Sequence, residues 1–290
     1  MIHTARQLKD LVRNRSKGNS TLAQTLLRNY AMERFLERIA MSPYKDNFIL
    51  KGGMLVSAIV GLDTRMTMDM DTTLRNLHLS AEHAKQIVSE ITSLQLDDNM
   101  RFEIKSVGEI MSEAEYSGIR IQLDAFLETM RTPLKIDIST GDVITPHEVE
   151  FSYPLMFEDR SIPIKAYNLE TVLAEKIETV LSRSTENTRL RDFYDLYILN
   201  SLHKDRIGQD TLRQALHATS EKRGSLHLLS DFKAILWEIR ANDAMEKQWQ
   251  KYQQRNDYAS AIQWSEVMDS VFEVSQMAIQ GDQLSSYLRR

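Results

Sequence analysis

The sequence contains no cysteine, which excludes disulfide bonds and thiolate metal sites. It has no apolar run near the roughly 20 residues that a membrane-spanning helix needs. The first six residues, Met-Ile-His-Thr-Ala-Arg, lack the apolar core of a signal peptide. Together these absences predict a cytoplasmic protein with no membrane partner.

Several common catalytic motifs are also missing. There is no Gly-x-x-x-x-Gly-Lys-Ser/Thr or Gly-x-Gly-x-x-Gly sequence, so P-loop hydrolysis and dinucleotide redox chemistry are poor interpretations. The seven histidines show no His-x-x-x-His or similar spacing, which argues against a zinc site. A serine nucleophile elbow is absent too. Any chemistry must therefore come from other polar residues.

Positive charge is in deficit, because 36 basic residues face 41 acidic ones and the net charge is −5. Such a chain does not coat nucleic acid by bulk charge, so a nucleic-acid partner would need a local basic patch. One candidate is the N-terminus, where five of the six charged residues among the first 17 are basic. The alternative for this segment is an ordinary solvated helix face.

Proline is confined to the first 163 residues, and residues 164–290 contain only three glycines. A long stretch without proline and with few glycines favours helices joined by short turns. The earlier residues mix helical periodicity with strand-like alternation. We therefore predict an α/β (α+β) chain, with a mixed sheet flanked by helices in residues 1–165 and an all-helical domain in residues 166–290.

Residues 65–73 alternate strictly between polar and apolar side chains, as a β-strand with one polar face does. Arg65, Thr67, Asp69 and Asp71 would then share a face, with the two aspartates about 7 Å apart at their Cα atoms. That spacing lets both carboxylates reach a shared pair of divalent cations. The Arg and Thr could hold phosphate oxygens.

A glycine pair precedes this segment. Residues 48–50 read as a short apolar strand, Gly52 and Gly53 follow, and residues 54–60 could form a helix. The backbone amides of such a turn can approach phosphate closely because no Cβ intervenes, and the helix N-terminus adds partial positive charge. Each motif alone is usually an ordinary turn or surface strand. Together they indicate the two halves of a nucleotidyltransferase site.

A third carboxylate lies on another predicted strand. Asp137 is flanked by Ile136 and Ile138, as in a central buried strand, and could neighbour the Asp69/Asp71 segment. Phosphoryl-group chemistry with two Mg²⁺ ions uses several hard oxygen ligands. Asp124 is a rival for this role, and we prefer Asp137 because of its β-branched neighbours.

Two helices of the second half carry charges in unusual places. Lys176 falls inside an apolar stripe, so its charge must be paired or directed into a cleft. The alternative is a lysine that snorkels at the edge of the stripe. Asp192 and Asp195 are three residues apart and share a narrow polar face. The alternative for Asp192 is a surface ion pair with Arg189.

Taken in order, five motifs resemble the AbiEii-type nucleotidyltransferase toxins of the DNA-polymerase-beta-like superfamily. They are Leu50-Lys51-Gly52-Gly53, Arg65-x-Thr67-x-Asp69-x-Asp71, Lys135-Ile136-Asp137, Leu173-Ala174-Glu175-Lys176 and Arg191-Asp192-Phe193-Tyr194-Asp195-Leu196. The resemblance implies a nucleotidyltransferase fold for the first domain, with the helical domain completing the active-site cleft. It also implies a bacterial toxin of a type IV toxin–antitoxin pair, which in some cases acts in abortive phage infection as an antiviral defence.

The resemblance further implies Mg²⁺ in a two-metal site and an NTP substrate. Some relatives add nucleotides to the tRNA 3′ end and so block translation and growth. A cognate antitoxin would be encoded nearby, with direct binding not required. The superfamily often has Gly-Ser at the glycine motif, so the Gly52-Gly53 pair of this chain replaces a hydroxyl contact by backbone amides at best.

On this interpretation the candidate site residues have three roles. Asp69, Asp71 and Asp137 bind the metal, Gly52, Gly53, Arg65, Thr67 and Lys176 hold the triphosphate, and Asp192 orients Lys176 or the nucleotide base. Asp137 is either the third ligand or the base. Two alternatives stay open: a non-catalytic module that binds nucleotide or RNA, and nucleotide transfer to a protein hydroxyl.

Overall fold

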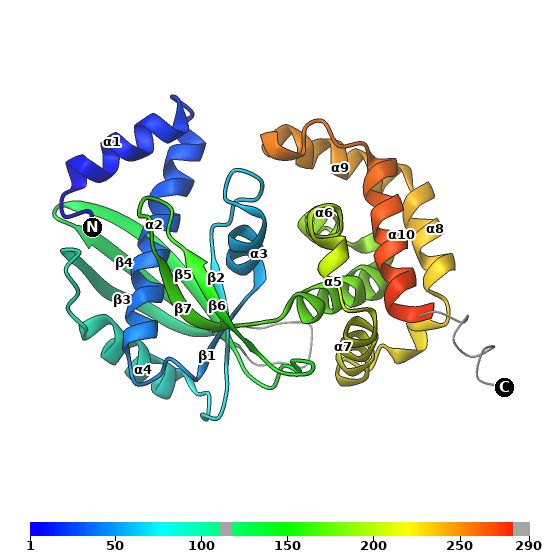
Figure 1. The fold of residues 1–290 in the computed structure, drawn as a ribbon, viewed down its shortest axis with the longest axis horizontal. Helices are drawn as coiled ribbons and strands as arrows, with labels where there is room; N and C mark the ends of the chain where they lie inside the picture. Colours follow the sequence, from blue (N-terminus) through cyan, green and yellow to red (C-terminus); the bar gives the residue numbers. More distant parts are fainter. Residues whose placement is uncertain (111–117, 281–290) are drawn as a thin grey trace. The chain divides into compact units, whose positions relative to one another are not determined.

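The structure, a computed structural model, describes residues 1–110 and 118–280 and divides the chain into two compact units (Figure 1). The first unit comprises Met1–Asp142 and Glu148–Tyr167, and the second comprises Val143–His147 and the residues after Tyr167. The domains predicted from the sequence, 1–165 and 166–290, place residues 143–147 in the first domain, whereas the structure places them in the second unit.

The first unit is a seven-stranded mixed sheet with helices. Its elements are α1 (Ala5–Ser16), α2 (Ser20–Met41), β1 (Phe48–Lys51), α3 (Gly52–Val60), β2 (Met70–Leu74), α4 (Ala81–Ser93), β3 (Met100–Ile110), β4 (Gly118–Leu127), β5 (Met130–Ser139), β6 (Val149–Pro154) and β7 (Ser161–Ala166). The strand order is β3-β4-β5-β2-β1-β7-β6. Strand β2 runs parallel to β5 and antiparallel to β1. The predicted α/β class with a mixed sheet is confirmed.

The two faces of this sheet differ in polarity. Buried apolar side chains of β4 and β5, such as Ile121 and Ile136, lie on one face. Helix α2 covers that face, where Phe35 meets Phe102 of β3 with 5.9 Å between the ring centroids. Because strand side chains alternate between faces, the charged residues of β2, β4 and β5 share the opposite face. The charged residues of the central strands are thereby gathered on one side.

Local sequence signals explain where several helices begin. In each case the side chain of a polar residue just before the helix accepts a hydrogen bond from a backbone N–H of the first turn. These N-cap residues are Thr4 before α1, Asn19 before α2, Ser80 before α4 and Asn168 before α5 (Leu169–Arg183). The caps satisfy amides that have no partner inside the helix.

Strand β2 is shorter than the alternation of residues 65–73 predicts. It begins at Met70, and β1 pairs no residue before Asp71, because the chain turns into α3 directly after Lys51. Residues 65–69 are therefore not part of the sheet. The expectation that Arg65, Thr67 and Asp69 share a strand face with Asp71 is wrong, because all three precede β2.

The second unit is helical in its described part, as the proline distribution predicts. After α5 come η1 (Ser184–Glu186), α6 (Leu190–His203), η2 (Lys204–Arg206), α7 (Gln209–Lys222), η3 (Leu226–Leu229), α8 (Phe232–Ala241), α9 (Asp243–Arg255), η4 (Asp257–Ala259) and α10 (Trp264–Gln280). Aromatic packing forms part of its core, with Phe193 and Trp264 at 5.4 Å between ring centroids. Across the described ranges, none of the helices combines the length and apolar character that a membrane crossing demands.

The segment 143–147 joins the start of α5. The Asn168 side-chain amide donates to the carbonyl oxygens of Thr145 at 2.7 Å and His147 at 3.0 Å. The Thr145 amide donates to the Thr171 hydroxyl at 3.1 Å. These bonds hold the five residues in the second unit although β6 and β7, which follow them in sequence, belong to the first.

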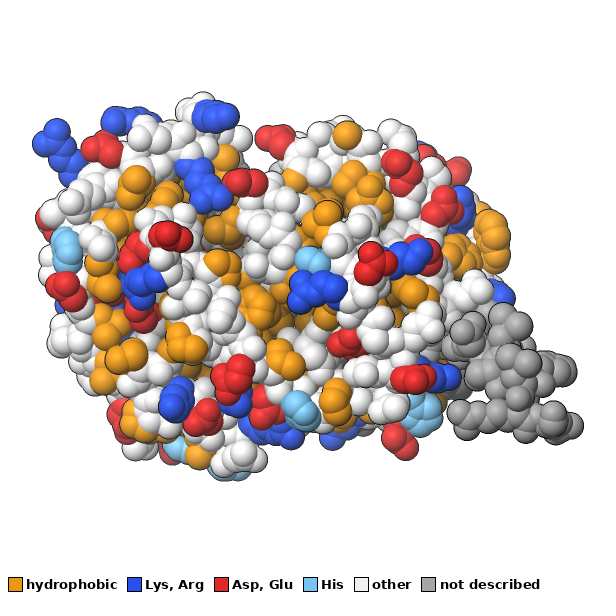
Figure 2. Space-filling model, in the orientation of Figure 1, with side chains coloured by type: hydrophobic (Ala, Val, Ile, Leu, Met, Phe, Trp, Pro, Cys, Tyr) orange, Lys and Arg blue, Asp and Glu red, His pale blue; other side chains and the backbone are white. Residues whose placement is uncertain are grey.

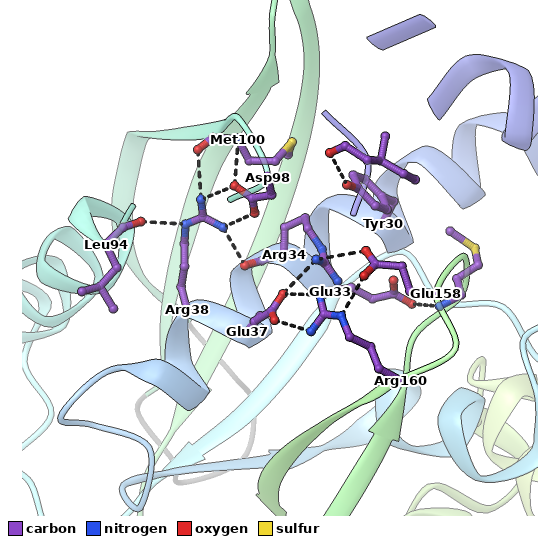
Figure 3. Close-up of polar contacts among 12 residues, drawn as sticks. Tyr30, Glu33, Arg34, Glu37, Arg38, Leu94, Asp98, Met100, Glu158 and Arg160 are labelled. Atoms are coloured by element: carbon purple, nitrogen blue, oxygen red, sulfur yellow. Dashed lines mark hydrogen bonds and ion pairs between the residues drawn. The ribbon is translucent and has the colours of Figure 1, made fainter. Parts of the chain in front are cut away.

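Buried charges fix α2 in the first unit (Figure 3). Arg38 donates to both carboxylate oxygens of Asp98, at 2.7 and 2.8 Å. Nearby, Nη1 of Arg34 lies 2.8 Å from Glu37 and 3.5 Å from Glu158. Ions removed from water need such partners, and losing one partner of a buried pair is costly. These pairs therefore constrain the position of α2.

Glu33 lies on the same helix and is also buried, with 1% of its surface exposed. One carboxyl oxygen accepts a hydrogen bond of 3.0 Å from the Met156 amide. Burial raises the pKa of Glu33 to about 8, against the opposing charge of Arg34. The group is thus protonated when folded and ionised when unfolded between its usual pKa of 4.5 and about 8. Through this group the folded state loses stability as pH rises across that window.

Glu33→Gln should remove this pH-dependent loss, because glutamine keeps an acceptor for Met156 and has no proton to release. The free energy of unfolding of the variant, relative to the parent, should rise by on the order of 3–4 kcal/mol between pH 5 and pH 8. Urea unfolding at both pH values measures this, with Glu82→Gln, exposed on α4, as the control. If the difference in free energy of unfolding between Glu33→Gln and the parent were the same at pH 5 and pH 8, Glu33 would not be protonated in the folded state.

Candidate active site

The polar face of the sheet carries a row of charges at its centre. In the strand register Arg120 of β4 lies opposite Asp137 of β5, Asp137 opposite Asp71 of β2, and Asp71 opposite Lys51 of β1. Residues paired across strands project to the same face. The row therefore runs positive, negative, negative, positive, and β2 and β5 are neighbours as predicted.

Asp71 occupies the middle of this row. Removal from water and the charge of Asp137 raise the pKa of Asp71, Asp69 adds to the rise, and Lys51 and a hydrogen bond from the Gly53 amide oppose it. Burial is the largest cause of the rise, and the two neighbouring carboxylates add to it. A bound cation would oppose that rise.

Two basic residues hold the other carboxylates. Arg120 donates through Nε and Nη2 to the two oxygens of Asp137, both at 2.8 Å, and these hydrogen bonds raise the pKa of Arg120. Nζ of Lys135 lies 2.7 Å from Oδ2 of Asp69. A bidentate charge-assisted pair fixes the direction of a carboxylate as well as its charge. Sequence reasoning gave Arg120 no role, because its only signal is the cross-strand register.

Asp124, the rival third carboxylate, lies on β4 opposite Pro133 of β5. It is buried and is held by Arg131 at 2.8 Å and Lys105 at 3.6 Å. Strand β4 is separated from β2 by β5, so Asp124 has no partner on β2. The register favours Asp137 as the neighbour of Asp71.

The glycine turn between β1 and α3 packs against these residues. Gly52 has a φ of +64°, and a Cβ built there would lie 2.8 Å from the Cβ of Asp71. A Cβ on Gly53 would lie 2.7 Å from Oγ1 of Thr67 and 2.8 Å from Nη1 of Arg65. The turn therefore has no room for a side chain at either position, because Asp71, Thr67 and Arg65 fill that space.

Arg65 and Thr67 are each only 3% exposed. Nη1 of Arg65 donates to the carbonyl of Met66 at 2.6 Å, and the Thr67 hydroxyl donates to the carbonyl of Asp69 at 3.2 Å. Both side chains therefore support the loop beside Gly53. Their predicted contact with a triphosphate stays a prediction.

A second polar cluster anchors Lys51. Its Nζ lies 2.7 Å from Oδ2 of Asp142, which also accepts hydrogen bonds from the hydroxyls of Ser139, at 2.6 Å, and Thr73. Burial of Asp142 acts to raise its pKa, but Lys51 and the hydrogen bonds outweigh burial and lower the pKa below its usual value. Asp142 was missed in the sequence because it follows β5 without a motif.

Lys176 of the second unit is paired. Its Nζ lies 2.9 Å from Oδ1 of Asp192 and 2.7 Å from Oδ2 of Asp195. These contacts explain how a lysine is accommodated inside an apolar stripe. They also show that Asp192 is an ion-pair partner of Lys176. The roles proposed for Lys176 and Asp192 toward a nucleotide stay predictions.

The carboxylates of the first unit fit a divalent cation by donor type. Mg²⁺ takes hard oxygen ligands, and Asp71 and Asp137 project side by side with Asp69 two residues earlier. Within residues 1–110 and 118–280, no three acidic or histidine side chains are already gathered as a metal site. Lys135 and Arg120 neutralise two of the carboxylates, so a bound cation would have to exchange with those two groups.

Comparison with known proteins gives one family and two similar structures. The sequence model of the family described as "Nucleotidyl transferase AbiEii toxin, Type IV TA system" matches residues 34–270. The crystal structure of JHP933 from Helicobacter pylori covers 92% of this chain and 98% of its own, with 15% identity and a TM-score of 0.52.

A candidate nucleotidyltransferase from H. pylori covers the same shares, with 15% identity and a TM-score of 0.48. No curated protein matches the chain. At this identity the structural likeness concerns the fold alone.

Gly52→Ala should destabilise the chain more than Gly224→Ala does. Both glycines have similar positive φ values, +64° and +67°, but a Cβ at Gly224 meets nothing within 4 Å, whereas one at Gly52 meets Asp71. We expect about 1 kcal/mol for the backbone conformation alone and about 1–3 kcal/mol more for the contact at position 52. Urea unfolding measures both, and equal losses would mean that Asp71 moves away freely.

Proposed function

We propose, from the premise that this chain belongs to the AbiEii family of nucleotidyltransferase toxins of type IV toxin–antitoxin systems, that it transfers NMP from an NTP to a hydroxyl at a tRNA 3′ end. The chain is thus a nucleotidyltransferase toxin whose family implies a cognate antitoxin. The observation that carries the proposal is the pairing of Asp71 with Asp137 beside the Gly52-Gly53 turn.

In the proposed reaction the acceptor hydroxyl releases its proton to solvent and its oxygen forms a bond to the α-phosphorus. The bond from that phosphorus to the bridging oxygen breaks, so that pyrophosphate leaves. Asp69, Asp71 and Asp137 would hold Mg²⁺, which when bound supplies charge neutralisation at the phosphates. The glycine turn and the N-terminus of α3 supply backbone groups that phosphate can approach closely. Lys135 and Arg120 supply fixed positive charge on the same face of the sheet.

Arg120 bears on the role of Asp137. Both oxygens of Asp137 accept hydrogen bonds from the guanidinium, which stabilises the anion and holds its orientation. We therefore favour a ligand role for Asp137 over a role as base. The second unit contributes Lys176 to the proposal as a phosphate-binding cation, which Asp192 orients through their ion pair.

The tRNA acceptor rests on the family resemblance, as does a role in abortive infection. Two other outcomes are distinguishable in one experiment. The protein is incubated with Mg²⁺, each labelled NTP, total tRNA and total protein, and the fraction that gains label is identified. Label in tRNA supports the proposal. Label in protein would show that the acceptor is a protein hydroxyl and not tRNA. Growth arrest without any transfer, persisting when the aspartates are mutated, would indicate sequestration by a non-catalytic module.

Asp69→Ala should abolish nucleotide transfer and growth arrest while the thermal melt stays nearly unchanged. The side chain is partly exposed and its one described ion pair, with Lys135, is not deeply buried, so little folding energy is lost. Asp97→Ala, a highly exposed surface aspartate, is the matched control. Undiminished growth arrest by Asp69→Ala would refute the mechanism.

A further inference from the structure

Helix α1 presents basic side chains to solvent. Its apolar residues Ala5, Leu8 and Val12 are buried against the rest of the first unit. Arg6, Lys9, Arg13 and Lys17 follow one another at spacings of three or four residues and are all exposed. At 100° per residue Arg6, Lys9 and Arg13 share another face of the helix, and Lys17 follows as its C-cap residue. We call these four residues the α1 basic face.

Few acidic side chains lie on or against α1; one is Glu128, whose carboxylate accepts a hydrogen bond of 3.1 Å from the Ala5 amide. Asp10 is the sole acidic residue among the first 17, and its ion pair with Arg13, at 2.7 Å, is solvent-exposed and weak. Arg6, Lys9 and Lys17 form no ion pair with any part of the chain that the structure describes. Figure 2 shows Lys and Arg side chains gathered along the edge of the first unit over α1. This concentration stands out because the whole chain has a net charge of −5.

Further basic residues connect this helix to the candidate active site within the same unit. Arg15 lies 3.1 Å from Asp63, in the loop that leads from α3 to Arg65. On α2, Arg28 donates to the carbonyl of Pro133 at 3.2 Å and contacts the sulfur of Met68 at 3.2 Å.

Met68 directly precedes Asp69, and Pro133 lies two residues before Lys135, which pairs with Asp69. Arg28 thus places positive charge beside the segment that carries Asp69, whereas the charge of Arg15 is paired with Asp63.

We propose that the α1 basic face binds the phosphate backbone of the acceptor RNA at a distance from its reacting 3′ end. The inference rests on the proposed transfer to RNA. Lys and Arg side chains that neutralise phosphates release counterions, so such binding is independent of sequence and falls steeply with salt. Binding through α1 would hold the acceptor while its end reaches Asp69 and Asp71.

A polyanion fits this face better than a membrane surface. A helix that lies in a membrane interface needs an exposed apolar face beside its basic one. In α1 the apolar face is buried, and Leu11 is its one exposed large hydrophobic residue. The helix therefore offers charge without an apolar surface for lipid.

The test compares two charge-matched triple variants in the full chain. The first is Arg6→Gln, Lys9→Gln and Arg13→Gln on α1. The second is Lys247→Gln, Lys251→Gln and Arg255→Gln on α9, where the basic residues are also exposed but are interspersed with Asp243 and Glu246. Glutamine is a good helix former, and a thermal melt checks that both variants fold. The double variant Arg6→Gln, Lys9→Gln, near the helix N-terminus where cations are unfavourable, serves if the triple variant unfolds.

Binding of labelled total tRNA is measured without NTP, over a range of salt concentrations. The α1 variant should bind on the order of 10- to 100-fold more weakly near 0.15 M salt, and its salt slope should be smaller in magnitude by about 2–3. The α9 variant should bind like the parent. Equal binding by the two variants would overturn the inference, as would a loss by the α1 variant on anionic vesicles but not on tRNA.

Transfer assays separate this inference from the proposed function. With tRNA as acceptor, the α1 variant should show a raised KM and an unchanged kcat, while a short oligonucleotide acceptor, which has few phosphates to reach α1, should react as with the parent. If the parent labels tRNA but the variants do not differ, the inference fails and the proposed function stands. If the parent labels no RNA while α1 still governs RNA binding, the proposed function fails and the α1 surface stands.

Discussion

The first unit depends on the opposition of two carboxylates across its central strands. Asp71 and Asp137 are register partners on β2 and β5, and like charges placed directly opposite each other destabilise a sheet. The neighbouring strands offset that repulsion. Arg120 on β4 binds Asp137 from one side, and Lys51 on β1 faces Asp71 from the other. Four strands thus share one electrostatic constraint, which sets the identity of residues on each of them.

The glycine turn between β1 and α3 also accommodates the carboxylate of Asp71. Asp71 fits beneath the start of α3 because Gly52 has no Cβ, and the Gly53 amide then donates to the carboxyl. The opposite face of the sheet packs on α2, whose buried Arg38 is paired with Asp98. The unit therefore keeps two separate sets of charges, one buried under α2 and structural, the other beside the turn and suited to chemistry.

The sequence predicted those parts of the site that local pattern determines. The isoleucines around Asp137 indicate a central strand, and the position of Lys176 in an apolar stripe indicates that it needs a partner, which Asp192 and Asp195 provide. Arg120 could not be predicted in the same way, because its partner depends on the register of two strands.

Prediction from local pattern fails at a second place, residues 65–69. Alternation in residues 65–69 does not reveal whether a neighbouring strand exists to pair with them. Here β1 ends at Lys51, opposite Asp71, and β5 pairs with this segment only from Met70 onward, so residues 65–69 lie outside the sheet.

The short segment 143–147 has a consequence for how the chain is assembled. The polypeptide passes from one unit to the other three times, at 142–143, 147–148 and 167–168. During synthesis the five residues emerge before β6 and β7, yet their partners Asn168 and Thr171 emerge only afterwards. Residues 143–147 therefore lie in the chain before the helix that binds them, while the strands that follow them complete the sheet of the first unit. A cut near residue 165 would separate α5 from the carbonyl groups that Asn168 binds, because the two units are interlaced in sequence.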